Sequence, residues 1–133
     1  MMHYLYLYLL TIPVFFIIDM LWIVGVARSF YQEKLAGLLG PVNWTAAGIF
    51  YALYIAAILI FAVLPALQSG SPMKALVLGA GFGFIAYATY DLTNLATLKD
   101  WPLIVTVVDM LWGAVLTGAV AYVSYHIGRM LGL

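Results

Sequence analysis

The sequence predicts an all-α integral membrane protein, an antiparallel bundle of four transmembrane helices. Of the 133 residues, 67% are hydrophobic and 8% are charged, and the mean hydropathy is +1.12. Soluble domains are about 45–50% apolar and about 25% charged. Four apolar segments reach the roughly 20 residues of helix that cross a bilayer core. The connections between them are short, so segments adjacent in sequence should be antiparallel neighbours in space.

We expect the whole chain, 1–133, to form a single polytopic membrane domain. Its four spans are predicted at about 4–27, 44–67, 73–98 and 102–130. The first span has no basic region before its apolar stretch, so we expect it to be retained and not cleaved as a signal peptide.

Two prolines indicate where the third and fourth spans begin. Pro72 and Pro102 suit the first turn of a helix, where the missing N–H leaves no hydrogen bond unmade. They support the predicted starts of the third and fourth spans.

The charged residues, the absence of cysteine and the positions of the histidines exclude several classes of function. Five Lys and Arg balance five Asp and Glu, so the chain has no basic patch for nucleic acid. Cysteine is absent, which excludes disulfides and thiolate metal sites. His3 and His126 both fall near the membrane face that holds the N-terminus, far from the acids within the spans. We therefore expect no metal and no cofactor.

The distribution of basic residues predicts an orientation. We name the N-terminal membrane face side A and the opposite face side B. The side-B connections hold Arg28, Lys34 and Lys99, whereas side A holds Lys74 and Arg129. Because cytoplasmic loops are enriched in Lys and Arg, side B is predicted to be cytoplasmic. Both termini should then lie together on the other face.

Three carboxylic acids fall inside the predicted spans at one depth. Asp19 lies nine residues before Arg28, Asp91 lies eight before Lys99, and Asp109 lies nine after the loop residue Asp100. At ~1.5 Å per residue, all three are about 12–14 Å from the side-B ends of their helices. We expect them to meet inside the bundle, with at least one protonated at neutral pH. Glu33 and Asp100 should instead lie in solvated side-B loops.

Other polar and aromatic residues are predicted at the same level. Asp19 and Asp109 each open the same four letters, Asp-Met-Leu-Trp, which also place Trp22 and Trp112 near them. Tyr87 and Tyr90 fall at this level in the third span. The candidate binding residues for a substrate or a proton are Asp19, Asp91, Asp109, Asn94, Tyr51, Tyr54, Tyr90, Trp22, Trp112 and Thr106.

Gly79 and Gly83 form a small-xxx-small pair within the third span. Such pairs allow membrane helices to approach closely, and we assign these glycines to packing.

The stretches "FYALYIAAILIFAVLPAL", "YATYDLTNLATLKDWP" and "VVDMLWG" resemble a family of small bacterial inner-membrane proteins of unknown function. The resemblance covers nearly the whole chain and implies a multi-pass protein of the bacterial inner (cytoplasmic) membrane. In that membrane, the distribution of basic residues described above predicts that the termini lie on the periplasmic side. The resemblance implies no established activity. The residues that carry it are Tyr90, Asp91, Thr93, Asn94, Lys99, Trp101, Pro102, Asp19, Trp22, Asp109 and Trp112.

Three functions are compatible with acids inside a membrane domain. The first is proton-linked transport of a small or amphipathic molecule, since buried acids commonly carry protons in transporters. Four spans are few for a transport path, so this function predicts a homodimer. The second is acid–base catalysis on a lipid or isoprenoid. The third is a structural or lipid-binding subunit, in which the acids only form hydrogen bonds between helices.

Overall fold

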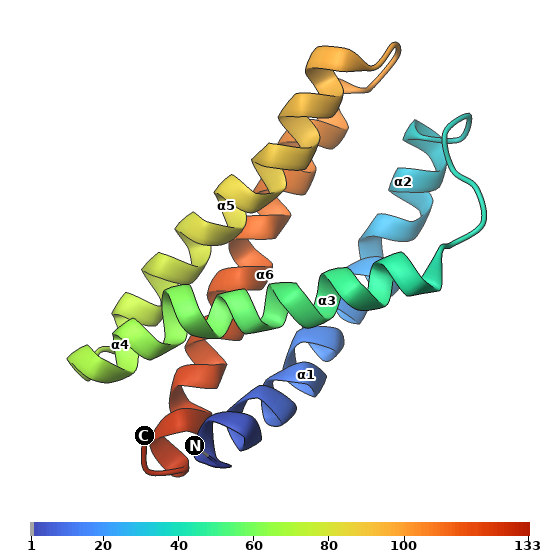
Figure 1. Ribbon diagram of the computed structural model, residues 1–133. Coiled ribbons are helices and arrows are strands. Elements are labelled where there is room, and N and C mark those ends of the chain that lie inside the picture. Colours follow the sequence, from blue (N-terminus) through green and yellow to red (C-terminus); the bar gives the residue numbers. More distant parts are fainter. Residues whose placement is uncertain (1) are drawn as a thin grey trace.

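The computed structural model describes residues 2–133, and within this range every regular element is helical (Figure 1). Four helical rods follow one another along the chain. The first consists of α1 (Met2–Trp22), the π-helical turn η1 (Ile23–Ala27) and α2 (Arg28–Lys34), and the second of α3 (Trp44–Ile58), the π-helical turn η2 (Leu59–Val63) and α4 (Leu64–Ser69). The third is α5 (Pro72–Thr97) and the fourth is α6 (Leu103–Met130).

All four rods are long and apolar enough to cross a membrane. The predicted fold class, an all-α bundle of four membrane helices, is thereby confirmed. The first and last described residues lie at the same end of the bundle (Figure 1).

The first rod is longer than the apolar segment at 4–27. It continues as helix through the sequence "RSFYQEK" to Lys34. Arg, Gln, Glu and Lys are all good helix formers, and the first glycine after Gly25 comes only at Gly37. Glu33, which was expected in a loop, therefore lies on α2.

Side chains and special residues mark the other helix ends. Asn43 accepts a hydrogen bond from the backbone N–H of Ala46 at 3.0 Å, and Ser71 accepts one from that of Lys74 at 3.1 Å. Both are ordinary N-caps for helices that begin one residue later. Gly70 closes α4 with a φ of 64°, a left-handed conformation that glycine adopts without strain.

α5 and α6 make the most extensive contact of any two helices among the described residues. Their approach depends on glycine, because a Cβ added at Gly79 would lie 2.7 Å from Ala121 Cβ and 2.8 Å from the Thr117 carbonyl oxygen. A Cβ at Gly83 would collide with the Gly113 carbonyl oxygen. The sequence-based assignment of these glycines to close packing agrees with this geometry.

α3 runs across the bundle at a large angle to α5 and α6 (Figure 1). The second rod, to which α3 belongs, contacts α5 and α6 mainly through η2 and α4. Pro65 follows η2 and has no N–H to bond the carbonyl one turn earlier, which explains why the helical ladder is irregular there. The N-terminal half of α3 consequently diverges from α5, and Ile49, Phe50 and Leu53 are about half or more exposed.

Replacing Gly83 with alanine should weaken the α5–α6 pair. The added methyl group meets a backbone oxygen that cannot move independently, so we expect the Gly83→Ala variant to lose about 1–3 kcal/mol of unfolding free energy. Denaturation of the purified protein in detergent measures this.

Gly81→Ala is the matched control for Gly83→Ala. Gly81 lies in the same helix, and a Cβ there meets nothing within 4 Å. Alanine is the better helix former, so this variant should keep or slightly gain stability. Equal losses in the two variants would contradict the close approach of the two helices.

Candidate functional site

The carboxyl groups lie between two apolar clusters. The larger cluster occupies the side-A half of the bundle and includes Phe15 and Leu116. The smaller one joins Leu35, Trp101 and Val105 near the side-B ends. Asp109 stands on α6 between Val105 and Leu116, so the site is walled off along the bundle axis by packed side chains.

Asp91 is fully buried, and neither of its carboxyl oxygens has a hydrogen-bond donor among the described residues. The carboxyl group of Asp109 lies next to it. Two carboxylates cannot hydrogen-bond to each other, but a carboxylic acid and a carboxylate can. The α5–α6 pair therefore presents two acids that need a proton between them to form a bond.

Asp109 is also bound by Tyr31, whose hydroxyl donates to Asp109 Oδ1 at 2.6 Å. Tyr31 lies on α2, in the helical extension beyond the apolar segment of the first rod. A bond of this length between a hydroxyl and a carboxyl oxygen is typical of a charge-assisted interaction. It connects the side-B end of the first rod to the carboxyl pair.

The π-helical turn η1 explains how Tyr31 reaches the site. Leu7, Thr11, Phe15 and Asp19 are buried at every fourth position of α1. Tyr31 lies twelve positions after Asp19, which in a regular α-helix would place it about 120° away around the axis. A π-helical turn holds one extra residue and offsets about 100° of this rotation. It returns Tyr31 to the face that carries Asp19.

Asp19 stands beside the pair and has its own partner. The indole Nε1 of Trp112 donates to Asp19 Oδ1 at 3.4 Å. The rings of Trp22 and Trp112 are stacked, with centroids 4.7 Å apart and planes within 10°. The repeated Asp-Met-Leu-Trp segments thus meet on antiparallel helices, through one acid and both tryptophans. The buried Nε1 of Trp22 lies near the Tyr31 hydroxyl but makes no hydrogen bond among the described residues.

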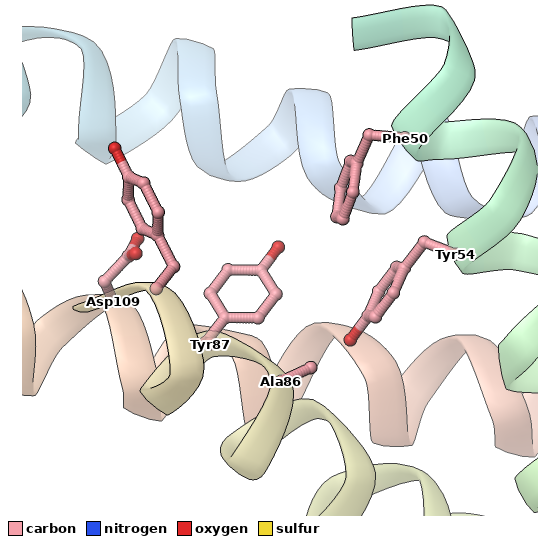
Figure 2. A pocket seen from close by; sticks show the side chains of 6 residues that line it. Phe50, Tyr54, Ala86, Tyr87 and Asp109 are labelled. Carbon is pink, nitrogen blue, oxygen red and sulfur yellow. The ribbon is translucent and has the colours of Figure 1, made fainter. Parts of the chain in front are cut away.

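A cavity of about 370 Å³ opens beside Asp109, between α3 and α5. The residues that line it are Phe50, Tyr54, Ala86, Tyr87, Tyr90 and Asp109. Figure 2 shows the Asp109 carboxyl at one end, the Tyr87 hydroxyl in the middle, and the Phe50 and Tyr54 rings at the other end. The cavity arises where the N-terminal half of α3 diverges from α5.

Contacts behind the cavity hold two of its aromatic walls in place. The Tyr54 hydroxyl is hydrogen-bonded to Thr117 Oγ1 at 2.7 Å. The Tyr90 ring packs edge-on against Trp101 with centroids 5.8 Å apart. The Trp101 Nε1 in turn donates to Thr106 Oγ1 at 3.1 Å. Thr106, a predicted site residue, thus supports the wall and does not line the cavity.

The structure brings together most, but not all, of the predicted site residues. Tyr51 packs against Phe15 and Phe16, outside the cavity beside Asp109. The Asn94 side chain makes no hydrogen bond among residues 2–133, although it lies one turn beyond Asp91. Asp19, Asp91 and Asp109 do converge, as a facing pair and a neighbouring third acid.

The list of predicted site residues missed Tyr31 and three residues that line the cavity, Phe50, Ala86 and Tyr87. Of these four, only Tyr87 was predicted to lie at the level of the acids. Tyr31 was placed in a loop because the first apolar segment ends before it. The fourfold spacing of Asp19, Ala27 and Tyr31 was an available signal, but it requires the π-helical turn to be known. Phe50 resembles any lipid-facing aromatic residue in sequence, and only the divergence of α3 makes it part of a cavity wall.

The described residues hold no cluster of three His, Asp or Glu side chains placed to bind a metal ion. His126 packs instead against Tyr122 and Tyr125, with ring centroids 4.8 and 5.2 Å away.

These features define a small integral membrane protein with acids and an aromatic cavity inside a four-helix bundle. Residues 4–126 match the model of the family described as "Predicted membrane protein (DUF2177)", and the chain belongs to this family. The resemblance to an uncharacterised membrane family is thereby confirmed. No curated protein matches the chain, and no solved structure matches it. A bacterial inner-membrane location and the side of the termini stay predictions.

Removing the Tyr31 hydroxyl should destabilise the fold modestly. The Tyr31→Phe variant loses the bond to Asp109, and we expect its unfolding free energy to fall by about 0.5–2 kcal/mol. Denaturant titration in detergent measures this. Tyr6→Phe removes the same group from an exposed tyrosine and should change stability by less than about 0.5 kcal/mol. Equal stability of both variants would contradict the Tyr31–Asp109 bond.

Asp91→Asn should fold at least as stably as the native protein. The amide nitrogen can donate to Asp109 in place of a shared proton, whereas an ionised Asp91 would have no donor at all. Replacing a buried charged group by a neutral one that can be accommodated is often neutral or stabilising. We expect an unchanged or higher unfolding temperature in detergent. A loss of more than about 1 kcal/mol would instead indicate that the Asp91 carboxyl itself stabilises the fold.

Proposed function

We propose that the protein is a proton-linked transporter of a small amphipathic molecule. The observation that carries this proposal is the Asp91–Asp109 pair, in which one carboxyl is sealed in the bundle and the other borders an open cavity. Ionisable groups inside membrane domains commonly form proton relays and substrate sites.

The pair supplies a proton-binding element. Two facing carboxylates inside a low-dielectric bundle repel each other strongly, and sharing one proton removes that repulsion. Asp91 is out of contact with solvent, so the proton reaches it most directly through Asp109. The Tyr31 hydroxyl donates to Asp109 Oδ1, which leaves Asp109 Oδ2 to interact with Asp91 or with a ligand.

The cavity supplies a substrate-binding element. Its rim is formed by Phe50 on α3 and Tyr90 on α5, which are 48% and 59% exposed. Both helices are membrane spans, so an opening between them faces the bilayer. An amphipathic molecule dissolved in the membrane could enter there without crossing the polar surface of the bundle.

Proton movement and substrate movement are coupled if Asp109 cannot bind a proton and a substrate at the same time. Binding of one then lowers the affinity for the other, and this reciprocal effect is the thermodynamic basis of exchange. We extend the proposal to a homodimer, because a single cavity in four spans opens between one pair of helices and does not itself form a path across the membrane.

A second candidate is acid–base catalysis on a membrane-dissolved lipid or isoprenoid. It is favoured by the position of the Tyr87 hydroxyl, which faces the same cavity as the Asp109 carboxyl (Figure 2). Such a pair could remove and return a proton on one substrate. Lipid profiling of a deletion strain tests this: one accumulated species would support catalysis, and an unchanged lipid profile would count against it.

The transport proposal predicts that both members of the pair are required for proton movement. In liposomes with an internal pH-sensitive dye, the native protein should give a substrate-linked pH response. Asp91→Asn and Asp109→Asn should each abolish this response, because neither amide can take up and release the proton.

Asp100→Asn is the matched control for these variants. It removes the same charge from an exposed residue in the turn between α5 and α6, where Asp100 has a φ of 60° that asparagine also tolerates. It should leave the pH response unchanged. A response that survives in folded Asp91→Asn and Asp109→Asn protein would overturn the proposed function.

A further inference from the structure

We propose that the cavity beside Asp109 binds a monovalent lipophilic organic cation, such as an amine or quaternary ammonium group attached to a small apolar body. This inference names the substrate class of the proposed transporter and rests on that function for its physiological meaning. The binding site itself is defined by the residues that line the cavity.

The sign of the ligand charge follows from the lining. Asp109 is the one ionisable residue among the lining side chains apart from tyrosines, and no Lys or Arg is present there. The bonded hydroxyl of Tyr31 stabilises negative charge on Asp109 Oδ1. An anionic ligand would meet this carboxyl without a counter-charge, whereas a cation would neutralise it.

The aromatic walls favour the same charge. Four of the six lining residues are Phe50, Tyr54, Tyr87 and Tyr90. The faces of aromatic rings attract cations, and sites for quaternary ammonium groups are commonly cages of such rings. Figure 2 shows the Tyr87 ring between Asp109 and the pair formed by Phe50 and Tyr54. A cation near Asp109 therefore has an aromatic ring beside it, and its apolar body has further rings to contact.

The walls are held in place before any ligand arrives. Phe50 and Tyr54 are stacked with centroids 5.2 Å apart, and Tyr54 is stacked in turn on Phe82 at 5.7 Å. Thr117 fixes the Tyr54 hydroxyl, as described above. A preformed wall lowers the entropy lost on binding.

The number of charges follows from the carboxyl pair. Asp91 lies next to Asp109 and outside the cavity lining. Two carboxyl groups that share one proton, as the proposed function requires, carry one negative charge between them. One negative charge is then left at the cavity, which matches a single positive charge. The volume of about 370 Å³ suits one small molecule and not a whole lipid.

A binding experiment with two matched probes tests this inference. Benzyltrimethylammonium carries the cation, and neopentylbenzene has the same shape with carbon in place of the charged nitrogen. Equilibrium dialysis against the full-length protein in nanodiscs, with empty nanodiscs as the blank, should show saturable binding of the cation only. Phenylacetate, an anion of similar size, should not bind.

Substitutions of residues that line the cavity test whether the cation binds there. Asp109→Asn should weaken cation binding by about tenfold or more, since it removes the charge partner. Phe50→Leu should weaken it by about two- to fivefold, because it removes a ring at the exposed rim, where the fold is least affected. Phe61→Leu removes a similarly exposed ring outside the cavity lining and should leave binding unchanged.

The outcomes separate this inference from the proposed function. Saturable binding of neopentylbenzene as tight as that of the cation, or cation binding unaffected by both Asp109→Asn and Phe50→Leu, would overturn the inference and leave the proton-flux test standing. Absence of saturable cation binding would also overturn it. Cation-selective binding without any pH response in liposomes would support the cation site and contradict the transport function.

Discussion

Carboxyl groups buried in a membrane bundle must find their hydrogen-bond partners within the protein. No basic side chain lies near the middle of the spans to neutralise them. Asp19 is bonded by an indole and Asp109 by a phenol, whereas Asp91 has only the other carboxyl of the pair. A group buried without a donor is costly in hydrocarbon, and natural proteins rarely keep such a group without a functional reason. Asp91 is therefore the residue whose burial most strongly indicates a function for the carboxyl pair.

Several departures from regular helix geometry build the site around this pair. Glycines on facing sides of α5 and α6 let the two helices approach until Asp91 and Asp109 meet. The π-helical turn η1 rotates Tyr31 toward the pair, and such turns occur often at functional sites. The turn η2 before Pro65 accompanies the crossing of α3, which leaves the aromatic cavity open on one side. The close approach of α5 and α6 thus forms the acid pair. The turn η1 brings the Tyr31 hydroxyl to that pair, and the divergence of α3 opens the cavity beside it.

The depth of the acids was predictable because rise along a helix is regular, so positions counted from the span ends give a common level. Their faces were less predictable. The apolar composition hides any difference between lipid-facing and protein-facing sides, which is why Tyr51 and Asn94 were predicted to be binding residues and Phe50 was not. Tyr31 was missed for a different reason. The spacing of Asp19, Ala27 and Tyr31 becomes informative only when the π-helical turn η1 is known. The convergence of the two Asp-Met-Leu-Trp segments could be anticipated from the antiparallel order of the spans, but the stacking of Trp22 on Trp112 could not.

The proposed function requires Asp91 and Asp109 to share one proton. Infrared spectroscopy of the purified protein in lipid tests it most directly, because a protonated carboxyl group has a C=O stretching band distinct from that of a carboxylate. A shared proton should give such a band at neutral pH, shifted on exchange into deuterated water, absent in Asp91→Asn and retained in Asp100→Asn. Absence of the band in the native protein, or an identical band in folded Asp91→Asn, would contradict it.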